Sequence, residues 1–133
     1  MKSIKSNGCI LIMDDEEPIR NLLTQALSIC GFKVLASRHG VETIEYFELA
    51  KKAGRPFDAL IMDLHIKNGM GGLETIKRLL EIDPEVKAIV SSANTNHPAM
   101  LNHKAFGFKG VIPKPYSFKE LKKEVYKLMP SGK

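Results

Sequence analysis

The chain has 133 residues, of which 44% are hydrophobic and 26% charged, and this balance fits one globular domain with a substantial core. No run approaches the roughly 18 apolar residues that a membrane span needs, and the start lacks a signal-peptide pattern, so we expect a cytoplasmic protein that does not contact the membrane. The net charge of +5 is spread along the chain without a recognisable nucleic-acid-binding motif, so direct binding of DNA or RNA is not expected.

Short apolar runs alternate with helical patterns along the chain. The runs predict strands at about residues 8–13, 32–36, 58–62, 87–91 and 109–112, and the intervening patterns predict helices at about residues 18–30, 37–53, 73–82, 97–106 and 117–128. Alternating strands and helices predict an α/β fold with a parallel sheet that is covered on both faces. We therefore expect a single domain over residues 1–133, with its core at about 8–129.

Four of the helices carry specific expectations about their ends or faces. Ser37 is the predicted cap of the second helix, and Ser117 opens a capping box with Glu120 at the last one. Glu16 and Glu17 are expected to serve only as charges at the start of the first helix. The side chains predicted to face the core from the second and third helices are Val41, Ile44, Phe47, Ala50, Leu73, Ile76 and Leu80.

Four of the predicted strands end on residues that are suited to handling a phosphoryl group. The carboxyl ends of parallel strands meet at one edge of the sheet, where ligands of such folds bind, so we expect these side chains to converge. They are Asp14 and Asp15 after the first strand, Asp63 after the third, Ser91 and Ser92 at the fourth, and Lys114 after the fifth.

This arrangement resembles the response-regulator receiver domain, the phosphoacceptor module of two-component signalling. The matching segments are residues 10–16, 61–64, 90–93 and 114–116, each at a strand end with a helix between. The resemblance covers about residues 8–129. It implies a flavodoxin-like (CheY-like) fold, a doubly wound sheet of five parallel strands in the order 2-1-3-4-5 with five helices.

The resemblance also implies a role for each matching residue. Ser92 is preferred to Ser91 as the switch hydroxyl because the family's hydroxyl is followed by Ala or Gly, as Ser92 is by Ala93. The Lys114–Pro115 bond is a candidate cis bond. The implied roles are Asp63 as phosphoacceptor and metal ligand, Asp14, Asp15 and the backbone carbonyl of His65 as further metal ligands, Ser92 as switch hydroxyl and Lys114 as phosphoryl contact.

The chemistry explains why these residue types belong together. Two unit charges about 4 Å apart repel by about 4 kcal/mol at an effective dielectric constant near 20, so crowded carboxylates need a cation. Oxygen ligands select Mg²⁺, with Mn²⁺ as a substitute. With the cation bound, Asp63 can act as a nucleophile toward phosphorus, while Lys114 and Ser92 contact the phosphoryl oxygens.

Three departures from the family pattern bear on how a signal is read out. Lys67 stands four residues after Asp63, where the family usually has Pro. The Gly-rich loop at residues 68–72 is one residue longer than usual, as in receivers attached to hybrid histidine kinases. Val111 replaces an aromatic residue three positions before Lys114, so the family's inward swing of a Tyr or Phe cannot occur at this switch position.

The function implied is phosphoryl acceptance from a sensor histidine kinase or a histidine phosphotransfer domain, followed by a change of partner. The face formed by the fourth helix, fifth strand and fifth helix is the expected readout surface, and a homodimer could form through it. The domain would catalyse no more than its own phosphorylation and dephosphorylation. Because the sequence ends just after the fifth helix, we expect a stand-alone receiver or a piece of a hybrid kinase.

Two alternatives stay open from the sequence. The first is a receiver fold that serves as a protein-interaction module without regulation by phosphorylation. The second is a Mg²⁺-dependent phosphatase with an aspartate nucleophile. Such enzymes usually place a second Asp two residues after the nucleophile, and His65 at that position argues against this alternative.

Overall fold

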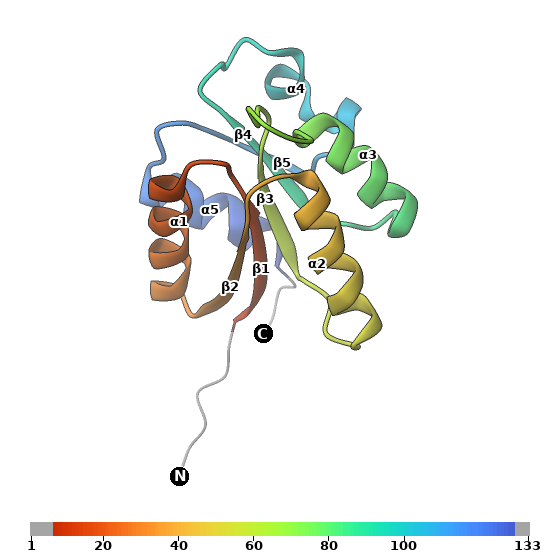
Figure 1. Ribbon diagram of the computed structural model, residues 1–133. Coiled ribbons are helices and arrows are strands. Elements are labelled where there is room, and N and C mark those ends of the chain that lie inside the picture. Colours follow the sequence, from red (N-terminus) through yellow and green to blue (C-terminus); the bar gives the residue numbers. More distant parts are fainter. Residues whose placement is uncertain (1–6, 130–133) are drawn as a thin grey trace.

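A central parallel sheet organises the structure, a computed structural model that describes residues 7–129 (Figure 1). Its order is β2-β1-β3-β4-β5, which confirms the fold class predicted from the sequence. The strands are β1 (Gly8–Met13), β2 (Phe32–Ser37), β3 (Ala59–Asp63), β4 (Ala88–Ser92) and β5 (Gly110–Pro113). The helices are α1 (Glu17–Ile29), α2 (Gly40–Lys52), α3 (Gly72–Ile82), α4 (Pro98–Leu101), the 3₁₀ helix η1 (His103–Phe106) and α5 (Phe118–Leu128).

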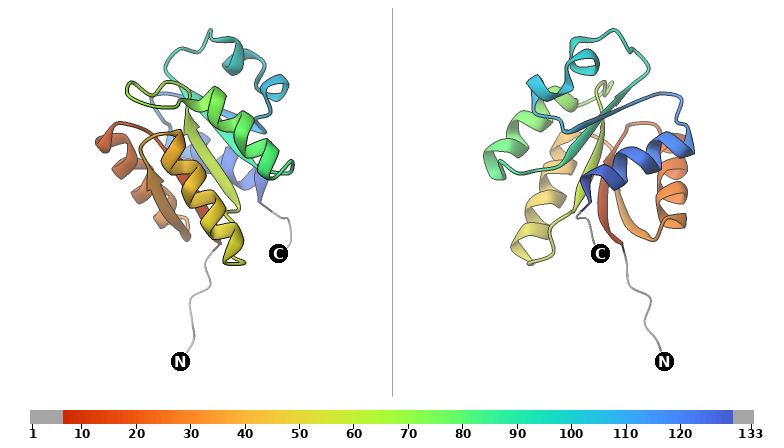
Figure 2. Two further views of the ribbon diagram at one scale, coloured as in Figure 1. Left: turned by 45° about the vertical axis from the view of Figure 1, so that its right-hand side comes forward. Right: turned by 180° about the vertical axis from the view of Figure 1, so that it is seen from behind.

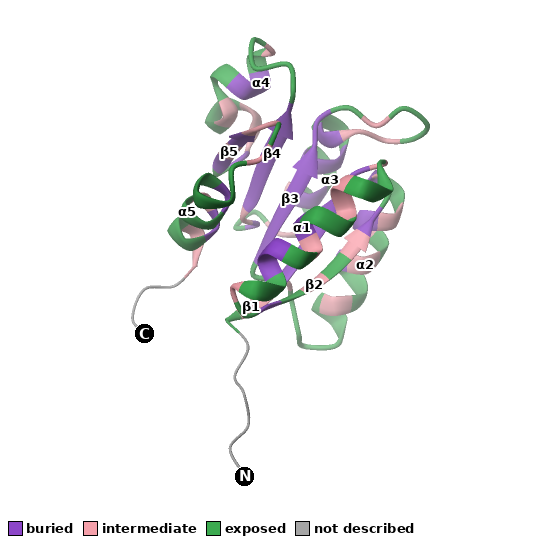
Figure 3. Ribbon diagram, turned by 90° about the vertical axis from the view of Figure 1, so that its left-hand side faces the viewer, coloured by how far each residue is buried: buried purple, intermediate pink, exposed green. Residues whose placement is uncertain are grey.

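Helices cover both faces of the sheet, so the central strands β1, β3 and β4 are largely buried on both sides, whereas the edge strand β2 is partly exposed (Figures 2 and 3). Side chains alternate along each strand, so Leu11 and Leu60 pack toward α2, α3 and α4, whereas Ile10 and Ile61 pack toward α1 and α5. Strands buried on both faces read as continuous apolar runs, and this is why the sequence located them well.

The start of α2 differs from the prediction. Ser37 is the last residue of β2 and is fully buried, and its hydroxyl donates to Ile12 O at 2.7 Å. His39 caps the helix instead, its side chain accepting from the Glu42 N–H. The buried stripe of α2 runs through Gly40, Thr43 and Phe47. Phe47 is therefore buried as predicted, whereas Val41 is 51% exposed and its predicted inward position was wrong.

Two further helices depart from their predicted form. In α3, Ile76 and Leu79 are buried, but Leu73 is 39% exposed, so its predicted inward position was also wrong. The continuous helix predicted over residues 97–106 is instead the short α4 followed by η1, with Asn102 in a non-helical conformation between them (φ −141°, ψ 60°). Only one turn of this segment is anchored by buried side chains, and Asn readily leaves helical geometry.

The loop after β3 lies directly against the first turn of α2. The Gly40 N–H donates to Met70 O at 2.8 Å. A Cβ atom on Gly40 would overlap the Thr75 hydroxyl and lie 2.7 Å from Met70 Sδ, so only glycine permits this approach. The contact joins α2, α3 and the loop that follows Asp63.

We expect Gly40→Ala to destabilise the protein by about 1 to 3 kcal/mol, because overpacking forces the loop or α3 to shift. Urea denaturation measures the free energy of unfolding. The control Val41→Ala changes the adjacent, half-exposed residue and should stay within about 0.5 kcal/mol of wild type. A Gly40→Ala variant as stable as the control would contradict the close packing described for this loop.

Candidate functional site

The carboxyl edge of the sheet brings the predicted residues together. Asp14 directly follows β1, Asp63 ends β3, Ser92 ends β4, and Lys114 directly follows β5. Because the strands are parallel neighbours, these ends meet at one edge, where Asp63, Ser92 and Lys114 line a pocket of about 310 Å³. The pocket is lined by Asp15, Glu16, Asp63, His65, Lys67, Ser92, Ala93, Asn94 and Lys114.

Lys114 holds two buried carboxylates at once. Its ammonium lies 2.8 Å from Asp14 Oδ2 and 3.1 Å from Asp63 Oδ2. The side chains of Asp14 and Asp63 are only 1% and 7% exposed, so neither charge has bulk water as an alternative partner. Removing the Lys114 ammonium would leave both buried carboxylates without their cation, and breaking a buried ion pair in this way typically costs about 3 to 5 kcal/mol.

Burial and the neighbouring charges act in opposite directions on the pKa values of Asp63 and Lys114. Burial raises the pKa of the Asp63 carboxyl, and the Asp14 charge adds to the rise, while Lys114 only partly offsets it. For Lys114, burial acts to lower the pKa of the ammonium, but the hydrogen bond with Asp14 and the charge of Asp63 outweigh burial and raise it. Lys114 is therefore protonated, and the environment disfavours the charged form of Asp63.

Asp14 also belongs to an acidic cluster with its neighbours Asp15 and Glu16. Carboxylate oxygens of Asp14, Asp15 and Glu16 all fall within 4.8 Å of one another. The Glu16 N–H donates to Asp14 Oδ1 at 2.9 Å, and Arg20 Nη1 donates to the Asp14 carbonyl at 2.8 Å, so this turn is held in place. An all-oxygen set with excess negative charge is the donor set that Mg²⁺ or Mn²⁺ prefers, and the residues present therefore fit such an ion.

Glu16 is the residue that the sequence analysis missed. We expected it to be only a helix-terminal charge, but it joins the acidic cluster and lines the pocket. Its position directly after Asp14 and Asp15 was the available signal. The single positive charge of Lys114 faces the four carboxylates of Asp14, Asp15, Glu16 and Asp63, so these five groups together carry net negative charge.

The two serines of β4 point to opposite faces of the sheet, as strand alternation predicts. Ser92 lines the pocket, and its Oγ accepts from the Asn94 N–H at 2.9 Å. Ser91 is fully buried, and its Oγ lies 2.7 Å from the Tyr116 hydroxyl on the face covered by α1 and α5. Ser92 is therefore the serine positioned to contact a group bound at Asp63.

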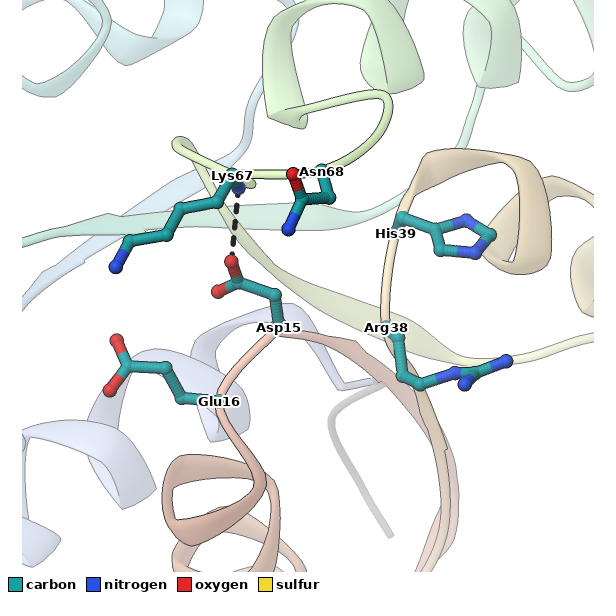
Figure 4. A pocket seen from close by; sticks show the side chains of 6 residues that line it. All are labelled: Asp15, Glu16, Arg38, His39, Lys67 and Asn68. Carbon is teal, nitrogen blue, oxygen red and sulfur yellow. Dashed lines mark hydrogen bonds between the residues drawn. The ribbon is translucent and has the colours of Figure 1, made fainter.

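The loop after β3 reaches over the acidic cluster. The Lys67 N–H donates to Asp15 Oδ2 at 3.0 Å (Figure 4). A proline, which the family usually has here, carries no N–H and could not make this bond. Asp15 and Lys67 also line a second pocket of about 430 Å³, together with Glu16, Arg38, His39 and Asn68. The Arg38 guanidinium forms an ion pair with Glu42 at 2.9 Å.

The remaining predicted residues lie close to Asp63 or farther along β5 and the segment after it. The His65 N–H donates to Asp63 Oδ1 at 3.3 Å, and its ring makes an edge contact with His97, with the ring centroids 5.6 Å apart. Val111 lies in β5, partly buried against the core cluster beneath α3 and α4. The Lys114–Pro115 bond is cis, as predicted.

Comparison with known proteins identifies the family. Residues 10–126 match the response regulator receiver domain, so the chain belongs to that family. It is 29% identical to sporulation initiation phosphotransferase F of Bacillus subtilis, covering 93% of the chain and 95% of the relative. It is 30% identical to the chemotaxis protein CheY of Thermotoga maritima, covering 80% and 85% respectively.

A solved structure shows the same fold. The response regulator TrrA of Thermotoga maritima, crystallised in complex with Mg²⁺ and BeF, superimposes with a TM-score of 0.75 at 27% identity, covering 92% of this chain and 99% of that one. Other curated relatives are longer, and the chain spans 47%, 28% and 46% of three of them. The likeness to several relatives is therefore to one part of a larger protein.

The chain is a receiver domain of two-component signalling with a CheY-like fold, which confirms the family and the function class predicted from the sequence. Receiver domains are phosphoacceptors rather than turnover enzymes, and they bind Mg²⁺ through an acidic pocket such as the cluster described here. Their partners in two-component systems are histidine kinases or phosphotransfer proteins.

We expect Asp63→Asn to raise the free energy of unfolding at neutral pH. Burial raises the pKa of Asp63 above its value in the unfolded chain, so between those two values the folded protein binds the proton more tightly and loses stability as the pH rises. The gain of the variant over wild type should therefore be largest near pH 7 and shrink toward about pH 4, the ordinary range of an aspartate. Urea unfolding across pH measures this gain. A gain that does not change with pH would contradict the strain assigned to Asp63.

Proposed function

We propose that Asp63 is the carboxylate that accepts the phosphoryl group. The observation that supports this best is the double contact of Lys114, which holds Asp63 beside Asp14 at the open edge of the sheet. A lysine whose only role is to stabilise the fold would not need to border a pocket. Here the ammonium borders a pocket together with Ser92 and the acidic cluster, so a group bound to Asp63 would meet all of them.

The proposed reaction is a displacement at phosphorus. An oxygen of Asp63 attacks the phosphorus of a phosphohistidine on a sensor histidine kinase or a phosphotransfer domain. A P–O bond forms as the P–N bond breaks, and the imidazole leaves with the electron pair of that bond. Lys114 would neutralise charge on the transferred oxygens, and the Ser92 hydroxyl would donate a hydrogen bond to one of them.

The acidic cluster would hold the cation for this reaction. We propose that Asp14, Asp15, Asp63 and the backbone carbonyl of His65 bind Mg²⁺, with Mn²⁺ as a substitute, and that Glu16 adds to the negative charge that attracts it. When bound, the ion would supply positive charge against the repulsion between the anionic acceptor and the anionic donor. Turnover would be limited to the domain's own phosphorylation and dephosphorylation.

We propose that the face of α4, β5 and α5 carries the change of partner. Leu101 of α4 is 70% exposed, and Lys127 of α5, whose charge acts on His103 of η1, is exposed at the same face. An exposed apolar residue with a cation nearby suits an acidic protein partner or a second copy of the chain. The homodimer and the absence of direct nucleic-acid binding stay predictions.

The extent and location of the protein also stay proposals. We propose that residues 1–133 form one receiver domain, and the family match at 10–126 lies within the predicted core at 8–129. No helix within residues 7–129 has the length and hydropathy of a membrane span. The cytoplasmic location expected from the sequence is still to be tested, as is attachment to a hybrid kinase.

Incubation with Mg²⁺ and acetyl phosphate should add one phosphoryl group, detected by mass spectrometry of the intact protein. Asp63→Asn should abolish the adduct because the attacking oxygen is gone. The control Asp83→Asn removes an aspartate at the far end of α3 and should leave the adduct unchanged. A wild-type protein that forms no adduct would overturn the proposal and favour the interaction module that phosphorylation does not regulate.

A further inference from the structure

A buried pair of hydroxyl groups lies behind the acceptor site and takes no part in the proposed chemistry. Ser91 Oγ and the Tyr116 hydroxyl are 2.7 Å apart, within hydrogen-bonding distance, and Ser91 is fully buried. Ser91 precedes the switch residue Ser92 in β4 and pairs with Asp63 in the sheet. Tyr116 precedes Ser117, which caps α5. The hydrogen bond therefore joins the acceptor edge to the start of a helix on the proposed readout surface.

The end of β4 forms two hydrogen-bonding contacts with the loop between β5 and α5. The Lys114 N–H donates to Ser92 O at 3.0 Å, and the Tyr116 hydroxyl meets Ser91 Oγ. Consecutive residues of one strand thus hold two residues of the loop that carries the Lys114 ammonium. A displacement of the end of β4 would therefore move the backbone at Lys114 and the side chain of Tyr116 together.

The surroundings of Tyr116 keep this hydrogen bond intact. Its ring packs against the core cluster that α1 and α5 form with the sheet. Burial raises the pKa of the Tyr116 phenol to about 12, so the phenol retains its proton at neutral pH. The geometry supplies one hydroxyl partner for each hydroxyl, and the ring leaves the phenol little freedom to turn elsewhere.

We propose that Ser91 and Tyr116 are positioning residues that fix the loop carrying Lys114 and transmit a shift at Ser92 to the first turn of α5. This role rests on the proposed acceptor function of Asp63. The chain lacks an aromatic switch residue, because Val111 is an aliphatic side chain packed against the core and cannot swing as an aromatic ring would. The hydroxyl pair would take over that role. The hydroxyl pair lies on the opposite face of the sheet from Val111 and offers a separate route.

The test uses beryllofluoride with Mg²⁺, which mimics a phosphorylated aspartate. Amide chemical shifts of residues 117–121 are recorded by NMR with and without the mimic in the full chain, and ¹⁹F signals report the adduct itself. Tyr116→Phe keeps the packed ring and removes only the hydroxyl, and Ser91→Ala removes the other partner. All proteins are compared at saturation, so that weaker binding is not mistaken for lost transmission.

We expect both variants to form the adduct but to lose most of the shift change in the first turn of α5. The double variant should lose no more than either single variant, because both remove the same bond. Tyr126→Phe, which removes a phenol at the far end of α5, should respond as wild type does.

Two results would overturn the proposal, and they are distinguishable. If the adduct forms in both variants and the first turn of α5 responds as fully as in wild type, the hydroxyl pair is only a packing element, whereas Asp63 keeps its proposed role. If wild type itself forms no adduct, the acceptor function fails, and the positioning role fails with it. A variant that does not fold leaves the other single variant to decide.

Discussion

The structure depends on one electrostatic constraint: negative side chains crowd the carboxyl edge of the sheet, and Lys114 is the cation that holds two of them. Lys114 and Asp14 are 100 positions apart in the chain, yet the ammonium and the carboxylate meet at 2.8 Å. Buried carboxylates of like charge oppose folding, and the pKa of Asp63 is raised as a result. Such strain is expected where a protein keeps a group ready for chemistry rather than for stability.

The rest of the fold provides the stability that tolerates this strain. The central strands β1, β3 and β4 are largely buried on both faces, and the residues at their centres, such as Leu11, Ile61 and Val90, have essentially no exposure. A rigid sheet fixes the strand ends, so the separation of Asp14 and Asp63 is set by the register of β1 and β3. The loops then adjust the site: the Lys67 N–H holds Asp15, and the Tyr116 hydroxyl holds the segment after Lys114.

Sequence reasoning predicted the strands and the residues at their ends because both signals are local. A strand covered on both faces is a continuous apolar run, and a polar residue directly after it must lie at the sheet edge. The faces of the helices were harder to predict, since α2 buries a stripe that includes the small residue Gly40 and the polar residue Thr43 and leaves Val41 outward. Glu16 was missed although its position directly after Asp14 and Asp15 was a signal. The Ser91–Tyr116 bond could not be predicted, because it depends on a contact between a strand and a distant loop that no periodicity records.

The central claim is that the acidic edge is built to take up a divalent cation. Isothermal titration calorimetry of Mg²⁺ into the full chain at neutral pH tests it most directly. The variant Asp15→Asn removes a proposed ligand. The control Asp58→Asn removes an aspartate just before β3, at the opposite end of the strand from Asp63. The account predicts saturable uptake of one ion by wild type and by Asp58→Asn, and greatly weakened uptake by Asp15→Asn. No uptake by wild type, or equal uptake by all three proteins, would contradict it.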